Sequence, residues 1–205
     1  SGYKEKKEQA WEQEVVSLSD KILVVTNSMK KAYQAAYPNY KTKFTTLYNG
    51  FDPDDFLNSS VDKELDSKKD EINIGYAGAL YIDRAEGLIK FAQGLEKNLM
   101  QSSRNVRIVI FSGQVDRSIV EYASSLNRLR IDFVSALPQV ELFEKLKTFD
   151  YLLSINASNV PFAFGTKIFE YIGLRSKIIL LSPKGELYNI IKESGCLVSD
   201  YSDFE

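Results

Sequence analysis

The stretch FGTKIFEYIGLRSKIILL, residues 164–181, joins a short helical pattern to an apolar run. Residues 166–173 are predicted to form a helix, and residues 177–181 are predicted to form a strand because the run is short and apolar. A helix followed at once by such a strand is typical of parallel sheets. This stretch therefore predicts one repeat of an α/β architecture.

The region from residue 72 onward repeats the pattern of the opening stretch. The predicted strands are 72–77, 106–111, 131–134, 151–155, 177–181 and 196–198. The helices predicted between them are 85–99, 117–127, 140–148, 166–173 and 186–193. Strands that alternate with helices predict βαβ units and a parallel sheet with helices on both faces. The fold class is therefore α/β, a Rossmann-like doubly wound sheet.

A smaller group of elements precedes this region. Residues 3–17 are charged, with Trp11, Val15, Val16 and Leu18 spaced like one helical face. Strands are predicted at 22–25 and 44–48, and between them a helix at 29–37 that Ser28 caps. Residues 52–71 lack apolar periodicity. We therefore expect three parts: 1–55, a linker at 56–71, and 72–205.

Composition excludes several classes of function. The chain has 205 residues and a net charge of −2, which provides no basic footprint for nucleic acid. It contains no histidine, which excludes histidine-based triads, histidine general bases and histidine metal ligands within this chain. The single cysteine, Cys196, is predicted to be a buried thiol and fits a reducing compartment. Because no signal peptide or membrane span is recognisable, we expect a cytoplasmic protein, which leaves peripheral membrane association open.

The helix start at residues 165–170 carries the first candidate site. Free N–H groups at a helix start attract anions, and Gly165 and Thr166 occupy that place. Lys167 adds a charge suited to a diphosphate, and Glu170, one turn later, could accept hydrogen bonds from ribose hydroxyls. The alternative is an ordinary helix with a Lys–Glu surface pair. Spacing alone leaves both interpretations open.

The loop after the strand at 72–77 carries the second candidate. In a doubly wound sheet, ligands bind outside the carboxyl ends of the strands, where Gly78 and Arg84 follow. Arg84 could bind pyrophosphate with two hydrogen bonds, or it could be a surface arginine. Gly113, after the next strand, could line the floor of the pocket or serve a turn, and we favour the turn. The acidic residues at 52–55 are interpreted as a solvated turn rather than a metal site.

The ordered set of motifs resembles the GT-B glycosyltransferases, especially the retaining family GT4. The matching segments are SDKILVVTNS (19–28), LYNGFD (47–52) followed by Phe56, IGYAG (74–78), GTKIFEYI (165–172), KGEL (184–187) and ESG (193–195). Each segment is weak alone, but their order matches that of the family over most of the chain.

The resemblance implies a role for each candidate residue. Glu170 would hold the ribose of a nucleotide-sugar donor, and Arg84 and Lys167 would meet the diphosphate and stabilise the departing nucleotide. Backbone groups at Gly78, Gly165 and Thr166 would line the donor site, and Leu137 would lie near the base. No metal and no cofactor are expected. A glycan or lipid-linked acceptor would bind an N-terminal domain, in surface polysaccharide or glycoconjugate synthesis.

Two positions depart from the family pattern. Phe162 stands where the family has the first acid of its paired-glutamate motif, and Ala79 replaces the usual arginine. These departures favour an alternative, a noncatalytic nucleotide- or sugar-binding module. A third interpretation, a nucleotide-sugar epimerase, is disfavoured by the absence of histidine and by the NGFD segment. We also expect an acceptor domain before Ser1 and a closing helix after Glu205, so this portion alone should turn over little.

Overall fold

The computed structural model describes residues 2–56, 70–157, 162 and 164–204. It separates into two compact units, Ser1–Asn49 with Phe162–Phe164, and Gly50–Pro161 with Gly165–Glu205. The predicted linker lies mostly at 57–69, outside the described residues. The assignment of these parts to acceptor and donor domains stays a prediction.

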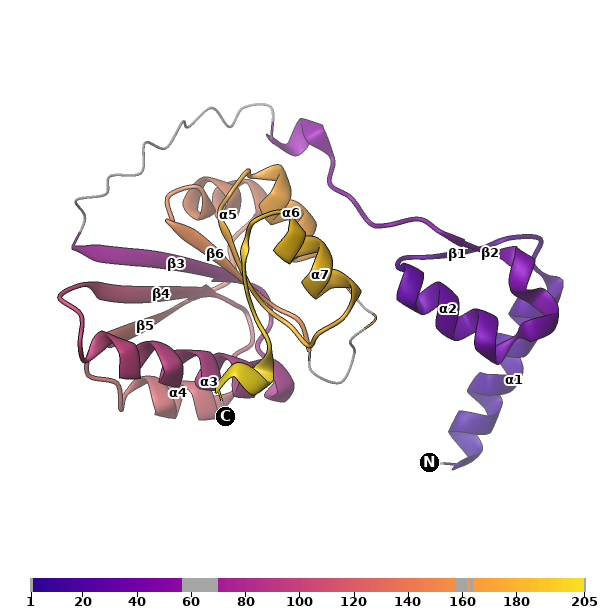
Figure 1. The fold of residues 1–205 in the computed structure, drawn as a ribbon, viewed down its shortest axis with the longest axis horizontal. Coiled ribbons are helices and arrows are strands. Elements are labelled where there is room, and N and C mark those ends of the chain that lie inside the picture. The colour runs from indigo at the N-terminus through magenta and orange to yellow at the C-terminus, as the bar shows by residue number, and fades with distance from the viewer. Residues whose placement is uncertain (1, 57–69, 158–161, 163, 205) are drawn as a thin grey trace. The chain divides into compact units, whose positions relative to one another are not determined.

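The larger unit contains a six-stranded parallel sheet (Figure 1). Its strand order is β5-β4-β3-β6-β7-β8. The bounds are β3 (Glu71–Ala77), β4 (Asn105–Phe111), β5 (Leu129–Val134), β6 (Tyr151–Ile155), β7 (Ile178–Leu181) and β8 (Leu197–Ser199). Every predicted strand of this region is present within two residues of its expected ends. The predicted α/β class with a doubly wound parallel sheet is therefore confirmed.

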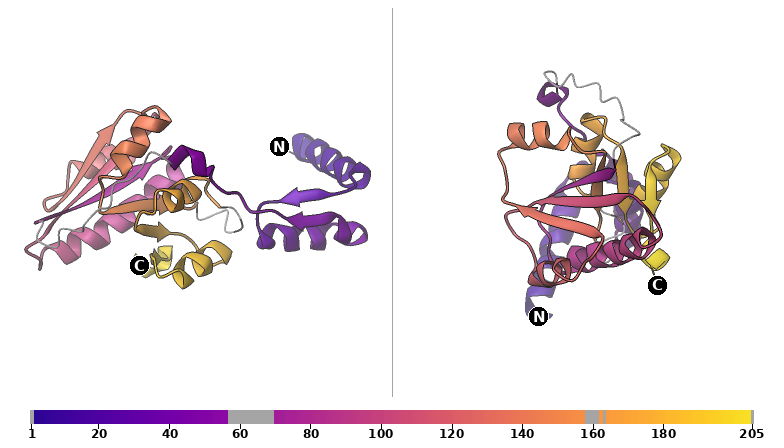
Figure 2. Two further views of the ribbon diagram at one scale, coloured as in Figure 1. Left: turned by 90° about the horizontal axis from the view of Figure 1, so that it is seen from above. Right: turned by 90° about the vertical axis from the view of Figure 1, so that its left-hand side faces the viewer.

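Helices cover both faces of this sheet. Figure 1 shows α3 and α4 together on one side and α5 and α6 on the other, and Figure 2 gives two further views of the same arrangement. The bounds are α3 (Ile82–Leu99), α4 (Arg117–Ala123), α5 (Gln139–Leu146), α6 (Lys167–Gly173) and α7 (Glu186–Glu193), with short 3-10 turns η2 (Pro53–Phe56) and η3 (Tyr201–Phe204). Helix α4 ends four residues before its predicted end, because the hydroxyls of Ser124 and Ser125 bond the carbonyls of Glu121 and Tyr122.

The smaller unit holds two parallel strands and two α-helices. Its elements are α1 (Gly2–Leu18), β1 (Ile22–Val24), α2 (Asn27–Ala36), η1 (Pro38–Lys43) and β2 (Phe44–Thr46). The predicted apolar face of the first helix is wrong in detail. Val16 is buried against Val24 and Phe44, whereas Trp11, Val15 and Leu18 are exposed. Residues 15 and 16 lie about 100° apart on a helix, and in this unit only the direction of Val16 meets the buried side chains.

The predicted cap of α2 is also wrong. Thr26, not Ser28, is the N-cap, and its hydroxyl accepts a hydrogen bond from the Met29 N–H at 3.0 Å. Its backbone is extended, with φ −147° and ψ 157°, as a capping residue requires. The same hydroxyl donates to the carbonyl of Phe162 at 2.7 Å. Thr26 is fully buried as a result.

Cys196 is half-buried, so the prediction of a buried thiol is wrong. It precedes β8, the last strand of the sheet order. An edge strand has a neighbour on one side only, which leaves the residues beside it partly open.

None of the helices in the described residues is both long and apolar enough to cross a membrane.

An aromatic strap at 51–56 packs on the larger unit. We use this name for Phe51 and Phe56, whose rings meet edge to face at 5.4 Å. Phe56 also stacks on Phe143 of α5, with ring centroids 5.0 Å apart. A Cβ built on Gly173 of α6 would lie 2.6 Å from Phe56 and 3.0 Å from Phe51. Glycine at position 173 therefore lets the strap lie against α6.

Replacing Gly173 with alanine should destabilise the chain by about 1–3 kcal/mol, because the new methyl group overpacks the strap. In a helix without such a neighbour the same change would stabilise by about 1 kcal/mol. Urea unfolding measures the difference. Gly50→Ala is the control, because a Cβ there meets nothing within 4 Å. Adding Phe56→Ala to Gly173→Ala should recover part of the loss, and no recovery would contradict the overpacking argument.

The carboxylate of Glu96 in α3 accepts hydrogen bonds from the backbone at the start of β5. Its Oε1 accepts hydrogen bonds from the N–H groups of Asn127 and Arg128 at 2.9 and 3.0 Å, and its Oε2 accepts one from Leu129 at 2.7 Å. Burial alone would raise the pKa of Glu96, but these donors outweigh it and hold the pKa below its usual 4.5. The ionised form is therefore favoured by folding.

Glu96→Gln should lower the free energy of unfolding by about 1–3 kcal/mol at neutral pH, since an amide offers one acceptor oxygen instead of two. Because the folded pKa is depressed, the wild-type advantage is fully present above about pH 4.5 and is lost as the pH falls through the folded value. Unfolding curves from pH 7 toward pH 3 measure this. Glu121→Gln, which breaks only the exposed pair with Arg117, should cost under about 0.5 kcal/mol. A difference in unfolding free energy between the wild type and Glu96→Gln that does not change with pH would refute the assignment.

Candidate functional site

The order of the strands places a topological switch point between β3 and β6. The chain proceeds outward through β4 and β5 on one side of β3, and through β7 and β8 on the other side of β6. Loops that leave two such neighbouring strands run in opposite directions and open a crevice at the carboxyl edge. Gly78 follows β3 directly, and the chain that leaves β6 continues in sequence to Gly165 and Thr166. The sheet thus brings both predicted sites to one switch point.

The turn after β3 requires its glycine. Gly78 has φ +142°, a conformation that side chains rarely allow. Its N–H donates to the carbonyl of Phe111 in β4 at 3.1 Å. Further along, the Leu80 N–H bonds to the Gln114 carbonyl at 3.0 Å, so the loops after β3 and β4 are joined. Gly78 thus turns the chain into α3 close above the sheet.

Arg84 lies in the first turn of α3 and is held against the Gly78 turn. Its Nη1 donates to the carbonyl of Ala79 at 3.3 Å. The hydroxyl of Tyr76 donates to the same carbonyl at 3.1 Å. Burial raises the pKa of Tyr76, and the neighbouring Arg84 guanidinium opposes that rise. The arginine is thus half-buried beside β3, with its charge directed back over the turn.

Lys167 and Glu170 form an ion pair on α6. The distance from Nζ to Oε2 is 2.7 Å, and the two side chains are 38% and 22% exposed. The helix begins at Lys167, one residue after its predicted start, and Thr166 is an N-cap without a side-chain capping bond. The open alternative of an ordinary Lys–Glu pair has this same geometry, so the ion pair by itself does not identify a ligand.

Gly165 leaves open space beside the backbone. A Cβ built there would have no other atom within 4 Å, and its φ is not in the left-handed region. Neither packing nor backbone strain therefore requires glycine at this position. The open backbone provides room for a group that approaches the start of α6.

Tyr171 is the site residue that the sequence analysis missed. It follows Glu170 and is fully buried, and its hydroxyl accepts a hydrogen bond from the Ala77 N–H at 3.0 Å. The hydroxyl of Tyr201, in contrast, donates a hydrogen bond to the carbonyl of Asn156, which directly follows β6. Both tyrosines fit an ordinary apolar pattern in the sequence. The one available signal was the position of Tyr171 within the GTKIFEYI motif.

Three other predicted positions do not join this group. Leu137 lies half-buried in the loop after β5, at the same edge of the sheet but two strands away from β3. Gly113 lies in a turn where the Ser112 hydroxyl donates to the Gln114 carbonyl at 2.6 Å, as predicted for a turn. Phe162 is 40% exposed and belongs to the smaller unit.

The acidic residues at 52–55 form a turn. The Asp54 N–H donates to Oδ1 of Asp52 at 3.0 Å, and Asp55 accepts from Gln139 at 3.3 Å. The described ranges contain no group of three or more Cys, Asp or Glu that could hold a metal ion.

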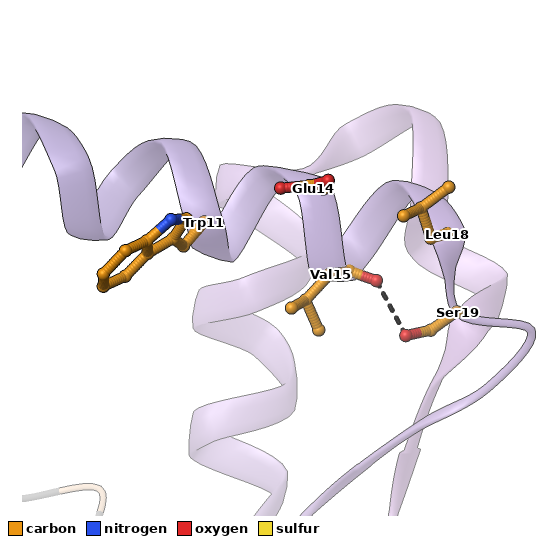
Figure 3. Close-up of a pocket in the computed structure, with 5 residues that line it drawn as sticks. All are labelled: Trp11, Glu14, Val15, Leu18 and Ser19. Atoms are coloured by element: carbon orange, nitrogen blue, oxygen red, sulfur yellow. Dashed lines mark hydrogen bonds between the residues drawn. The ribbon is translucent and has the colours of Figure 1, made fainter.

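The hollows of the described surface include one on α1 and one beside the Gly78 turn. Figure 3 shows the one on α1, where Trp11, Val15 and Leu18 lie with Glu14, and where the Ser19 hydroxyl donates to the Val15 carbonyl at 2.7 Å. None of the residues that line it carries a positive charge. The second lies between the loops after β3 and β4 and is lined by Leu80, Tyr81, Asp83, Gln114, Val115, Asp116 and Arg117. It adjoins the Gly78 turn on the side away from β6.

Comparisons by sequence and by structure give different results. No protein-family model matches the sequence. A search of the curated proteins found no match either. The structure, in contrast, resembles solved glycosyltransferases.

Three of these solved structures are representative. A trehalose-phosphate synthase from Burkholderia vietnamiensis superposes with a TM-score of 0.65 at 13% identity, over 94% of this chain and 51% of that one. HepE from Anabaena, solved with UDP and glucose, gives 0.58 at 16%, over 91% and 50%. The pneumococcal O-GlcNAc transferase GtfA, solved with UDP and GlcNAc, gives 0.52 at 16%, over 82% and 31%.

At these identities the likeness concerns the fold alone. This chain spans about half the length of the trehalose-phosphate synthase and of HepE. The described residues have a GT-B glycosyltransferase fold, of which the six-stranded sheet is a Rossmann-like half.

Proposed function

We propose that this chain supplies the donor-binding half of a glycosyltransferase that uses a nucleotide-diphosphate sugar. The observation that carries the proposal is the meeting of two elements at the switch point between β3 and β6. The Gly78 turn with Arg84 comes from one strand, and α6 with Lys167 and Glu170 follows the other. Ligands of doubly wound sheets bind at such a point.

Each residue of the proposed site binds the part of the donor that its chemistry suits. Arg84 and Lys167 meet the diphosphate, and the N–H groups near Gly165 and Thr166 approach it from the helix start. Glu170 accepts hydrogen bonds from the vicinal ribose hydroxyls once Lys167 turns toward phosphate. Gly78 keeps the turn below the diphosphate free of a side chain. Leu137, at the outer strand of the same edge, contributes to the base end.

The reaction that we propose needs no metal and no cofactor. Negative charge develops on the departing nucleoside diphosphate, and the guanidinium of Arg84 and the ammonium of Lys167 stabilise it. The acceptor, a glycan or a lipid-linked sugar, binds outside the larger unit on the N-terminal half of the enzyme. We assign the enzyme to the GT4-like group, acting in surface polysaccharide or glycoconjugate synthesis in the cytoplasm or at the cytoplasmic face of a membrane.

A noncatalytic nucleotide-binding module remains the second candidate. Ala79 offers only a carbonyl where the family pattern has an arginine, and Phe162 offers no acid toward a transferred sugar. Such a module would bind the nucleoside diphosphate alone as tightly as the nucleotide sugar. Comparing UDP with UDP-glucose, together with transfer by the full-length protein, separates the two candidates.

Glu170→Ala should weaken binding of UDP about 10- to 100-fold, because hydrogen bonds to a charged group contribute about 1.5–3 kcal/mol. Isothermal titration of the chain with UDP, and with GDP in parallel, measures the change.

The control for Glu170→Ala is Glu144→Ala on α5. Glu144 pairs with Lys147 at the same i,i+3 spacing, with an Nζ–Oε1 distance of 2.6 Å, and plays no part in the proposed site. The affinity of the Glu144→Ala variant for UDP should equal that of the wild type. Equal losses in both variants, or no nucleotide binding by well-folded wild-type chain, would refute the donor site.

Arg84→Ala should weaken the binding of UDP about tenfold or more and leave the binding of uridine almost unchanged, since only UDP carries the diphosphate that a guanidinium binds. The matched control is Arg117→Ala on α4, because Arg117 pairs with Glu121 at 2.6 Å on the exposed surface. Competition titrations with UDP and uridine report the ratio. A parallel loss of uridine binding would mean that Arg84 only supports the fold.

A further inference from the structure

Strands β3 and β6 separate toward the proposed site. Their pairing covers Ile74 with Tyr151 and Gly75 with Leu152. Yet β3 continues to Ala77 and β6 to Ile155. The last residues of β3 therefore have a sheet neighbour only on the side of β4, where pairing continues to Ala77 with Phe111. The parting of these two strands leaves backbone groups of β3 without the ladder bonds that a continuous sheet would provide.

The N–H of Ala77 is such a group. Successive N–H groups of a strand point to opposite neighbours, and the N–H of Gly78 points to β4, where it bonds to Phe111. The Ala77 N–H thus points into the opening toward β6. It is not left unpaired there, because the hydroxyl oxygen of Tyr171 accepts it at 3.0 Å. Ala77 and Tyr171 are both buried, so this bond is the partner that the structure provides for a backbone donor away from bulk solvent.

Helix α6 depends on tertiary contacts to hold its place. It is seven residues long, too short to be stable by itself, and Thr166 gives it no side-chain cap. Tyr171 directly follows Glu170 and lies four residues after Lys167. The bond to Ala77 therefore fixes the turn of helix that carries the ion pair against the strand end that carries Gly78. Burial raises the pKa of Tyr171, which keeps the phenol neutral.

We propose that Tyr171 is a positioning residue for nucleotide binding: its bond to Ala77 sets the distance between the Lys167–Glu170 pair and the Gly78–Arg84 turn. This inference rests on the proposed donor function of the same site. A ligand that spans both elements needs them in register, because its ribose and its diphosphate are joined covalently. A shift of α6 by a fraction of an ångström would then reduce affinity without unfolding the chain.

The test is Tyr171→Phe, which removes the hydroxyl and keeps the ring. Affinity for UDP should fall about tenfold or more, since α6 no longer has a fixed distance from β3. Hydrogen exchange should speed up at Ala77 and along α6. Titration calorimetry and exchange mass spectrometry on the chain measure the two effects. An unchanged affinity for UDP overturns the inference and leaves the proposed donor site standing.

A purely structural role is excluded with a stability-matched control. Ile119 on α4 is fully buried in the core on the other face of the sheet. Ile119→Val and Ile119→Ala lower the melting temperature in steps that bracket the loss in Tyr171→Phe. They should bind UDP like the wild type. If affinity falls in all three variants in proportion to melting temperature, Tyr171 is structural only and the inference is overturned.

A double-mutant cycle with Glu170→Ala tests whether Tyr171 acts through its neighbour. If it does, Tyr171→Phe should change UDP affinity much less in the Glu170→Ala background than in the wild type. Fully additive losses overturn the inference. Failure of the wild-type chain to bind UDP or GDP is a different result, because it removes the proposed function and the positioning role with it.

A second variant covers the case in which Tyr171→Phe does not fold. Lactic acid incorporated in place of Ala77 replaces the N–H with an ester oxygen and leaves the ring and hydroxyl of Tyr171 intact. This ester variant should weaken the binding of UDP by a factor similar to that of Tyr171→Phe. Affinity equal to that of the wild type would overturn the inference.

Discussion

A parallel sheet can open at its carboxyl edge only if the N–H groups that lose their ladder partners find others. A buried donor without a partner costs about 1–3 kcal/mol, a large share of the stability of a domain. In this chain the opening lies between β3 and β6, and the hydroxyl of Tyr171 accepts the N–H of Ala77 there. The same contact holds α6 beside the Gly78 turn. The geometry of the candidate site therefore depends on how the backbone of β3 is satisfied.

The charged side chains of this site have partners within the protein that a ligand can displace. Lys167 pairs with Glu170, and Arg84 donates to the Ala79 carbonyl over the turn. A partly exposed helical pair contributes only about 0.3–0.5 kcal/mol. A ligand with several phosphate oxygens can displace such a pair, because each cation then gains a charged acceptor. The ion pair keeps both side chains near the helix start until that exchange takes place.

Helix α6 is held from two directions. Tyr171 meets the end of β3, and Gly173 lies against the aromatic strap of Phe51 and Phe56. The absence of a Cβ at position 173 permits the second contact, just as the left-handed backbone of Gly78 permits the turn that α6 faces. A short helix without a side-chain cap keeps a defined position because packing takes over the task of local stability.

The sequence by itself determined the strands and helices of the larger unit, because hydrophobic periodicity and short loops are local properties. It also identified Gly78, Arg84, Lys167 and Glu170, whose part in binding stays a prediction. It misjudged the exposure of Cys196 and the cap of α2, which depend on neighbours from other elements.

Only the tertiary structure decided which side chain fills the opening in the sheet. Tyr171 and Ala77 are 94 residues apart in the chain, and a buried tyrosine in a helical pattern looks like any other core aromatic. Its hydroxyl acquires a role only when the strand order places β3 beside β6 and leaves a backbone donor to be satisfied.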